Sequence, residues 1–131
     1  MRYIVIGSKG FVGSSIFKSL TLETKEEVIG ISRQEIDLLS IKSTERIKTK
    51  INEDDVIVFC AAEAPVKNLN MFTNNINMLS NLLYNLENIN IKNFVYLSSD
   101  AVYSDSMKSI NEEYETEPDN LHGIMHLTRE N

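Results

Sequence analysis

The chain of 131 residues has little of what marks secreted, membrane-spanning or nucleic-acid-binding proteins. It contains one cysteine, Cys60, which excludes an internal disulfide and fits a reducing cytoplasm. No apolar run is long enough to span a membrane, and the short apolar start at residues 3–6 is not expected to act as a signal peptide. A net charge of −6 argues against nucleic acid as the main partner.

The charge is spread unevenly along the chain. Residues 1–50 carry nine Lys and Arg against six Asp and Glu, a net charge of +3, and residues 51–131 carry four against thirteen, a net charge of −9. The acidic stretch at residues 111–119 is expected to be a solvated loop without metal-ligand geometry. The length is that of one domain, so a single domain over residues 1–131 is expected.

Apolar runs and helical patterns alternate along the chain. Strands are predicted near residues 2–7, 27–32, 55–61 and 93–98, and helices near residues 11–21, 41–50, 69–89 and 120–130. Such alternation predicts an α/β protein with a Rossmann-like, doubly wound parallel sheet in three layers. Right-handed crossovers lead us to expect the strand order 3-2-1-4, with the fourth strand at an edge and a ligand crevice at the carboxyl ends of the strands.

Two of the predicted helices have apolar residues at helical spacing, in the sets Phe11, Val12, Ile16, Phe17, Leu20 and Phe72, Ile76, Leu79, Leu83, Leu86. The second stripe is predicted to face the core, and a role in a dimer contact stays open.

Three glycines follow the first predicted strand at a regular spacing of three residues: Gly7, Gly10 and Gly13. In such a loop the first glycine permits a tight turn, the second lets a pyrophosphate approach the backbone, and the third lets the next helix pack on the sheet. The alternative is an ordinary strand–turn–helix connection. A second strand about twenty residues later favours the phosphate-binding interpretation, because that is the spacing of the ribose-selecting residue.

The residue at the end of the second strand is Arg33, where a carboxylate would select NAD. A guanidinium is a permanently charged donor suited to a 2′-phosphate, and the hydroxyl of Ser32 can add a donor. The sequence therefore favours NADP as the cofactor, with NAD as the alternative. A solvated arginine without this role stays open.

Small or hydroxyl-bearing residues follow the third and fourth predicted strands. Ala61 and Ala62 leave room for a cofactor beside the glycine loop, and Cys60 is expected to be an inert core residue. Ser98 and Ser99 follow the fourth strand, where chemistry is expected in such sheets, although they also suit a hydroxyl-capped turn.

These landmarks resemble the N-terminal portion of extended short-chain dehydrogenases/reductases, in the NAD-dependent epimerase/dehydratase family. The resembling stretches are the glycine motif, Asp37-Leu38, Cys60-Ala61-Ala62, the helix Asn75-Ile-Asn-Met-Leu-Ser-Asn81, and Lys92 to Tyr103. The resemblance implies that Ser99 holds the catalytic hydroxyl position and that Asp37 and Leu38 contact the adenine. It implies cofactor contacts at Gly7, Ser8, Gly10, Phe11, Val12, Gly13, Ser32, Arg33, Asp37, Leu38, Cys60, Ala61, Ala62 and Asn75.

The sequence departs from this family where a Tyr-x-x-x-Lys pair is expected. His122 stands at the tyrosine position and His126 at the lysine position, and the glycine after the first of them, Gly123, is retained. The spacing puts both imidazoles on one helix face. They either form an altered acid/base pair or belong to a site that binds cofactor without chemistry, and no third metal ligand is evident nearby, so no metal is expected.

The resemblance implies a cofactor-binding domain of an enzyme that oxidises, reduces, epimerises or dehydrates nucleotide sugars by hydride transfer. The alternative is a non-catalytic dinucleotide-binding regulatory or scaffold protein. Family members carry further strands and a substrate domain, so the chain is expected to be a truncated part of a longer enzyme or a separate domain, and to be inactive alone. A cytoplasmic homodimer is the expected setting.

Overall fold

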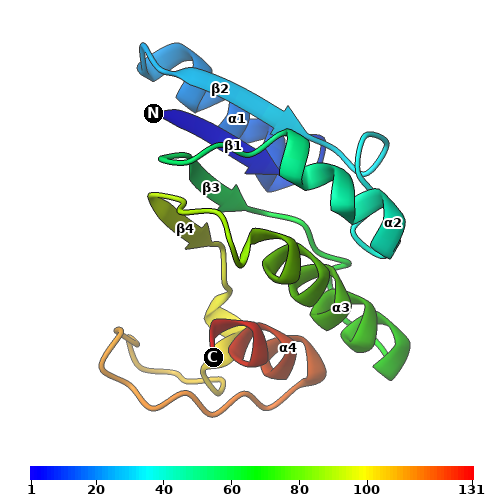
Figure 1. The fold of residues 1–131 in the computed structure, drawn as a ribbon. Helices are drawn as coiled ribbons and strands as arrows, with labels where there is room; N and C mark the ends of the chain where they lie inside the picture. Colours follow the sequence, from blue (N-terminus) through cyan, green and yellow to red (C-terminus); the bar gives the residue numbers. More distant parts are fainter. The chain divides into compact units, whose positions relative to one another are not determined.

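The computed structural model describes residues 1–131 and contains a four-stranded parallel sheet with helices (Figure 1). The strands are β1 (Arg2–Ile6), β2 (Glu27–Ile31), β3 (Val56–Phe59) and β4 (Asn93–Tyr96). The α-helices are α1 (Phe11–Glu23), α2 (Ile41–Thr44), α3 (Leu69–Leu86) and α4 (Leu121–Glu130), with short 3-10 helices η1 (Glu45–Thr49) and η2 (Asp100–Val102). None of the helices combines the length and the apolar character needed to cross a membrane.

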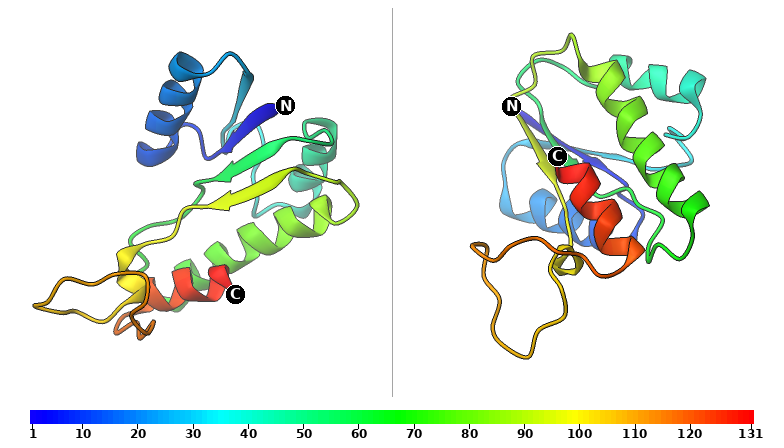
Figure 2. Two further views of the ribbon diagram at one scale, coloured as in Figure 1. Left: turned by 90° about the vertical axis from the view of Figure 1, so that its left-hand side faces the viewer. Right: turned by 90° about the horizontal axis from the view of Figure 1, so that it is seen from below.

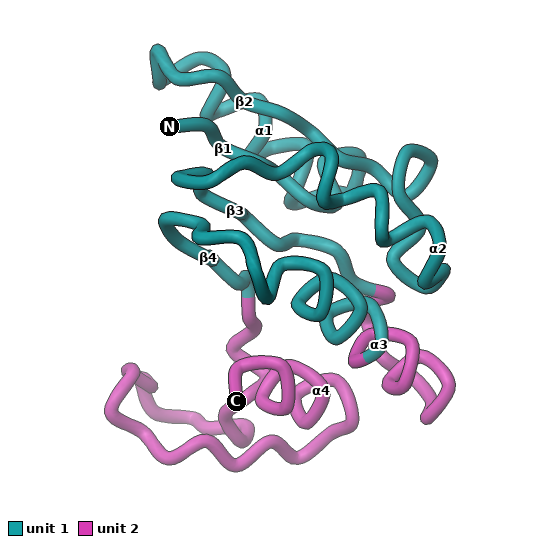
Figure 3. The backbone as a smooth tube through the Cα atoms, in the orientation of Figure 1, with its two compact units in different colours: residues 1–62, 77–97 teal, residues 63–76, 98–131 magenta.

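The chain divides into two compact units (Figure 3). Unit 1 comprises residues 1–62 and 77–97, and unit 2 comprises residues 63–76 and 98–131. Each unit is described by itself below.

Unit 1 contains the sheet. Helix α1 covers one face, and α2 with the unit 1 part of α3 covers the other (Figures 1 and 2). All strand pairs are parallel, which confirms the predicted doubly wound α/β class and its three layers. The largest buried cluster is mainly aliphatic, and its strand residues share one face of the sheet, because they alternate along each strand and pair with one another: Ile4, Ile6, Ile31, Ile36, Leu38, Ile47, Ile51, Ile57, Phe59, Met78, Leu79, Leu82 and Leu86.

The strand order is β2-β1-β3-β4, so the predicted order 3-2-1-4 is wrong. The handedness rule constrains the hand of each crossover but leaves open on which side of β1 the third strand pairs. In the structure β3 pairs with β1, from Tyr3 opposite Val56 to Ile6 opposite Phe59. The direction of winding therefore reverses between β1 and β3. The fourth strand lies at an edge, as predicted.

Two helix predictions need correction. The helix predicted over residues 41–50 is a four-residue α-helix, whose N-cap Ser40 accepts a hydrogen bond from the Ser43 N–H, followed by the 3-10 helix η1. On α3 the buried face includes Leu82 and Asn85 and excludes Leu83, which is 46% exposed. The amide of Asn85 donates to the Asn81 carbonyl at 2.8 Å, so a polar residue can occupy the buried face.

Unit 2 contains the first residues of α3, the 3-10 helix η2, helix α4 and the segment between them. Residues 104–117 of that segment are exposed, which agrees with the solvated acidic loop expected from the sequence. Helix α4 begins after Asn120, whose side chain accepts a hydrogen bond from the Gly123 N–H at 2.9 Å. A Cβ on Gly123 would lie 1.9 Å from the Ala101 carbonyl oxygen, so α4 and η2 pack at backbone contact distance.

Candidate functional site

The loop between β1 and α1 contains two glycines, Gly7 and Gly13, that no other residue can replace without a shift of the backbone. Gly7 has a φ of 90°, and a Cβ there would lie 2.9 Å from the Ala61 backbone nitrogen. A Cβ on Gly13 would lie 2.2 Å from the Gly7 carbonyl oxygen. The loop therefore folds tightly against the first turn of α1 and the end of β3, all within unit 1.

The N-terminus of α1 is open to a ligand. Gly10 is the N-cap, has no side chain to satisfy the first amides, and no acidic residue lies in the first turn. A Cβ on Gly10 would meet only the Gly7 carbonyl oxygen within 4 Å, at 3.3 Å, so the space beyond it is open. Phe11 is 96% exposed and Val12 is 51% exposed beside it. A helix N-terminus of this kind fits an anion such as a pyrophosphate.

The strand β2 is tied directly to this loop. The Ile31 carbonyl accepts hydrogen bonds from the N–H groups of Gly7 and Ser8, at 2.8 and 3.2 Å. A Cβ on Gly30 would lie 2.8 Å from the Ser8 hydroxyl oxygen, so that side chain packs over β2. The structure thus brings the loop and the end of β2 together, as the sequence predicts for a dinucleotide site.

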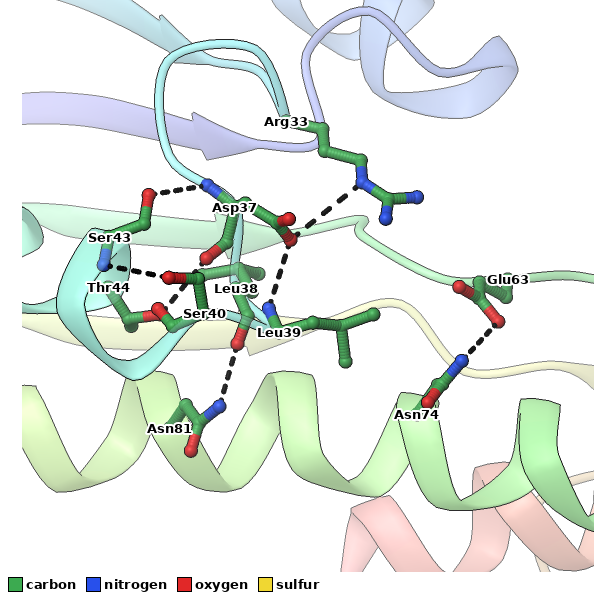
Figure 4. A network of polar contacts seen from close by, with 10 residues as sticks. All are labelled: Arg33, Asp37, Leu38, Leu39, Ser40, Ser43, Thr44, Glu63, Asn74 and Asn81. Atoms are coloured by element: carbon green, nitrogen blue, oxygen red, sulfur yellow. Dashed lines mark hydrogen bonds and ion pairs between the residues drawn. The ribbon is translucent and has the colours of Figure 1, made fainter.

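The candidate ribose-selecting residues follow β2 (Figure 4). Ser32 is 3% exposed, and both its N–H and its hydroxyl donate to the Glu35 carboxylate at 2.9 Å. The Arg33 side chain is 70% exposed and its Nε lies 3.7 Å from the Asp37 carboxylate. Such an exposed pair is weak, so the Arg33 guanidinium is free to turn toward a phosphate.

The predicted adenine-contacting pair lies in the same segment. Asp37 is half-buried, and its carboxylate accepts a hydrogen bond from the Leu39 N–H at 3.1 Å. Leu38 is buried in the core, and its carbonyl accepts a hydrogen bond from the Asn81 amide at 2.8 Å (Figure 4). Asn81 and Glu35 were not among the predicted site residues. Asn81 ends one of the stretches that resemble the family, and Ser32-x-x-Glu35 has the spacing of a capping box, so these two patterns were the signals that could have found them.

Cys60, Ala61 and Ala62 follow the last residue of β3, because the strand ends at Phe59 and is shorter than predicted. Cys60 is half-buried, and burial raises the pKa of its thiol to about 11, so it stays protonated and inert at neutral pH. The side chain of Cys60 lies against Gly13, and the backbone of Ala61 against Gly7. Both residues therefore border the glycine loop, as predicted.

In unit 2, Asn75 secures the segment that leads into α3. Its amide oxygen accepts from the Glu63 N–H at 3.0 Å, and its amide nitrogen donates to the carbonyls of Glu63 and Met71 at 2.9 and 2.8 Å. The Asn75 side chain is completely buried. These side-chain contacts all hold protein backbone, which is a positioning function, and a direct cofactor contact of Asn75 stays a prediction.

Ser99 is the N-cap of η2. Its hydroxyl oxygen accepts from the Ala101 N–H at 3.2 Å and its hydroxyl donates to the Asp100 carboxylate at 3.2 Å. The capped turn that the sequence left open as an alternative is therefore present. The catalytic assignment of Ser99 is compatible with it, since a half-exposed hydroxyl can exchange these weak contacts for a ligand.

His122 and His126 lie on one face of α4, as their spacing predicts. Their ring centroids are 4.6 Å apart and the rings are nearly perpendicular. His122 is half-buried, and its Nδ1 accepts from the Val66 N–H at 3.4 Å. His126 is 6% exposed, and burial, with the nearby His122 and Arg129, lowers its pKa to about 4. No group of three or more His, Cys, Asp or Glu side chains is placed to hold a metal ion.

Fold and loop together define a Rossmann-like domain with a glycine turn after its first strand. The family model for the NAD dependent epimerase/dehydratase family matches residues 3–130, so the chain belongs to this family. The resemblance found in the sequence is thereby confirmed. A search of curated proteins finds no match.

Solved structures with this fold include enzymes of nucleotide-sugar metabolism. A dTDP-4-dehydrorhamnose reductase from Clostridium acetobutylicum has a TM-score of 0.81 and 23% identity over 99% of this chain and 48% of its own. The same enzyme from Bacillus anthracis, in complex with NADP, has a TM-score of 0.81 and 21% identity over 98% of this chain and 47% of its own.

A UDP-glucuronic acid 4-epimerase from Bacillus cereus, in complex with UDP-glucuronic acid and NAD, has a TM-score of 0.80 and 21% identity over 99% of this chain and 50% of its own. The chain thus spans about half the length of these structures. At these identities the likeness concerns the fold.

Proposed function

We propose that the chain is the nicotinamide-dinucleotide-binding domain of an epimerase, dehydratase or reductase of nucleotide sugars. Membership of the NAD dependent epimerase/dehydratase family supports the cofactor class. The similar enzymes described above act on nucleotide sugars, and their structures include complexes with NAD and with NADP. We also propose that the chain is a single domain of a longer protein and that this protein is cytoplasmic.

The observation that carries the proposal is the geometry of the glycine loop. The helix N-terminus at Gly10 is uncapped by any side chain and has open space before it. The tight approach of Gly13 to Gly7 aims the first turn of α1 at that space. Backbone N–H groups and the helix dipole would hold the pyrophosphate there.

The test is a titration of the chain with NADP and NAD, followed by calorimetry or by fluorescence of the reduced forms. Gly10 has an extended backbone that other residues adopt, and aspartate is a favoured N-cap, so Gly10→Asp should fold normally. Its carboxylate would repel the pyrophosphate and lower affinity by about 100-fold. Gly10→Asn is the matched neutral control and should lose much less. Equal losses in the two variants, or no binding to the wild type, would contradict the proposal.

NADP is proposed as the preferred cofactor, with NAD as the alternative. The preference rests on Arg33, which is exposed, permanently charged and placed directly after β2. Ser32 supports it less than the sequence suggests, because its N–H and hydroxyl are already bonded to Glu35.

For the chemistry we propose His122 as the acid/base group and Ser99 as the hydroxyl that binds the reacting sugar oxygen. The bound nicotinamide would supply hydride transfer. His122 keeps one ring nitrogen on the Val66 N–H, which orients the ring and leaves the other nitrogen for a proton. His126 stays neutral at physiological pH because its pKa is about 4, so it orients its neighbour without adding charge.

Replacing His122 by phenylalanine keeps a flat ring and removes both ring nitrogens. In the full-length protein this variant should lose about 100-fold in turnover of nucleotide sugars while dinucleotide affinity is kept. Unchanged turnover would remove His122 from the mechanism.

A second candidate is a regulatory or scaffold module that binds dinucleotide without turnover. The observation that favours it is the neutral state of His126, which cannot provide the positive charge of the family's lysine. It predicts that wild type and His122→Phe bind dinucleotide equally and that neither consumes reduced cofactor with any nucleotide sugar. Homodimer formation belongs to both candidates, and sedimentation of the full-length protein tests it.

A further inference from the structure

The turn after β2 holds a negative charge where a phosphate would be recognised. The Glu35 carboxylate accepts hydrogen bonds from the N–H and the hydroxyl of Ser32, each at 2.9 Å. These bonds, the backbone one first, lower the pKa of Glu35, so the carboxylate is ionised at neutral pH. Ser32 is buried while Glu35 is exposed, so the Glu35 carboxylate covers the donors of Ser32 on the side that faces solvent.

This turn is part of the same surface as the glycine loop. The Ile31 carbonyl, directly before Ser32, accepts from the N–H groups of Gly7 and Ser8. On the other side the Lys9 ammonium donates to the Gln34 side-chain oxygen at 2.8 Å. Two independent sets of contacts therefore hold the turn beside the loop within unit 1.

The backbone N–H and the hydroxyl of Ser32 already have a partner from the chain. Ser32 is paired with Glu35, and the Arg33 guanidinium lies near Asp37. A backbone N–H, a hydroxyl and an arginine are the donors that a phosphate monoester takes in proteins. The Glu35 carboxylate therefore provides Ser32 with negatively charged oxygen acceptors of the kind that such a phosphate has.

We propose that Glu35 is a specificity-determining residue that competes with the 2′-phosphate of NADP for the donors of Ser32. The inference rests on the proposed dinucleotide function and refines it. A 2′-phosphate has to displace a like charge, whereas the 2′-hydroxyl of NAD can donate to that carboxylate. Glu35 thus lowers the affinity for NADP, which Arg33 raises. The wild type therefore discriminates between NADP and NAD less than Arg33 alone implies.

The experiment measures affinities of the full chain for NADP, NAD and adenosine 2′-monophosphate, by calorimetry for the dinucleotides and by NMR for the monophosphate. Glu35→Gln removes the charge and keeps the shape. We expect its affinity for NADP and for adenosine 2′-monophosphate to rise about tenfold, with NAD affinity equal or lower. Glu45→Gln, which removes an exposed charge from η1, is the matched control and should leave all three affinities unchanged.

The Ser-x-x-Glu pattern is also that of a capping box, in which Glu35 would only stabilise the turn. In that case Glu35→Gln lowers the thermal midpoint and changes NADP and NAD affinity by the same factor, which would overturn the inference. Adenosine 2′-monophosphate reports on the turn without the glycine loop. Failure of both dinucleotides to bind the wild type would therefore count against the proposed function, while an unchanged response to this nucleotide in Glu35→Gln counts against Glu35.

Discussion

The glycine loop of unit 1 matches the pattern of the family, whereas the histidine pair of unit 2 departs from it. The loop keeps Gly7, Gly10 and Gly13, and each has a geometric task in the structure. The pair replaces the expected tyrosine and lysine, and one of its members is buried and neutral. A glycine loop depends on backbone conformations and close contacts that residues with a side chain cannot adopt, whereas one acid/base side chain can replace another.

The difference teaches that, on the proposed function, binding and chemistry are expected to be separable in this chain. The proposed phosphate contacts come from backbone N–H groups of the loop, so they do not depend on the residues at positions 122 and 126. Three predictions test how far the two regions differ.

The largest effect is expected from adding one methyl group at the closest backbone contacts. Gly13→Ala would bring a Cβ to 2.2 Å from the Gly7 carbonyl oxygen, and Gly123→Ala to 1.9 Å from the Ala101 carbonyl oxygen. Each should lower the free energy of unfolding by at least about 3 kcal/mol, because backbone must move. Gly30→Ala would meet side chains rather than backbone, with Ser8 at 2.8 Å and the Phe17 ring at 3.1 Å, so it should cost less and serves as the milder comparison.

Denaturant titrations measure these losses, and dinucleotide titration of the folded fraction separates the two regions. Gly13→Ala should abolish dinucleotide binding, while Gly123→Ala should keep it wherever the chain stays folded. Loss of binding in both to the same degree would mean that the two regions are one functional unit.

An intermediate effect is expected from pH through His126. Its folded-state pKa of about 4 lies below the usual 6.5 because burial disfavours the charged ring. The unfolded chain therefore binds more protons between these values, and stability falls as the pH drops from about 6.5 to 4, by at most roughly 1.4 kcal/mol per pH unit. Stability curves of wild type and His126→Asn should converge at low pH. Parallel curves throughout would contradict the assignment.

The smallest effect on stability is expected at Arg33. Its side chain is 70% exposed and its pair with Asp37 spans 3.7 Å, so Arg33→Ala should change the free energy of unfolding by less than about 0.5 kcal/mol. The same change should weaken NADP about tenfold and leave NAD unaffected. An equal loss for both cofactors would show that Arg33 does not select between them. Arg33→Lys, which keeps the charge without the planar fork, is the matched variant.

Much of the fold could be predicted because its signals are local. Alternating apolar runs and helical periods identified all four strands and the helices α1, α3 and α4, with ends displaced by up to three residues. The strand order could not be predicted, because it depends on which side of β1 receives β3. The buried face of α3 was predicted in part: Leu79 and Leu86 are buried, but Leu83 is exposed and Asn85 is buried, with its amide donating to the Asn81 carbonyl.

The candidate site divides in the same way. The glycines, Arg33 and the spacing of the histidines are visible as residue types at fixed intervals. Three other properties are not visible in the sequence, because each depends on burial or on hydrogen-bond partners. They are the pairing of Ser32 with Glu35, the hydrogen bond from Asn81 to the Leu38 carbonyl, and the lowered pKa of His126.

The sequence by itself determined the α/β class, the glycine loop and the absence of the usual tyrosine and lysine, because glycine spacing and residue identity are properties of the linear chain. Only the tertiary structure decided the strand order, the neutral state of His126 and the hydrogen bonding of Ser32 to the Glu35 carboxylate. Those properties arise from desolvation and from contacts between side chains and backbone, which exist only once the chain is folded.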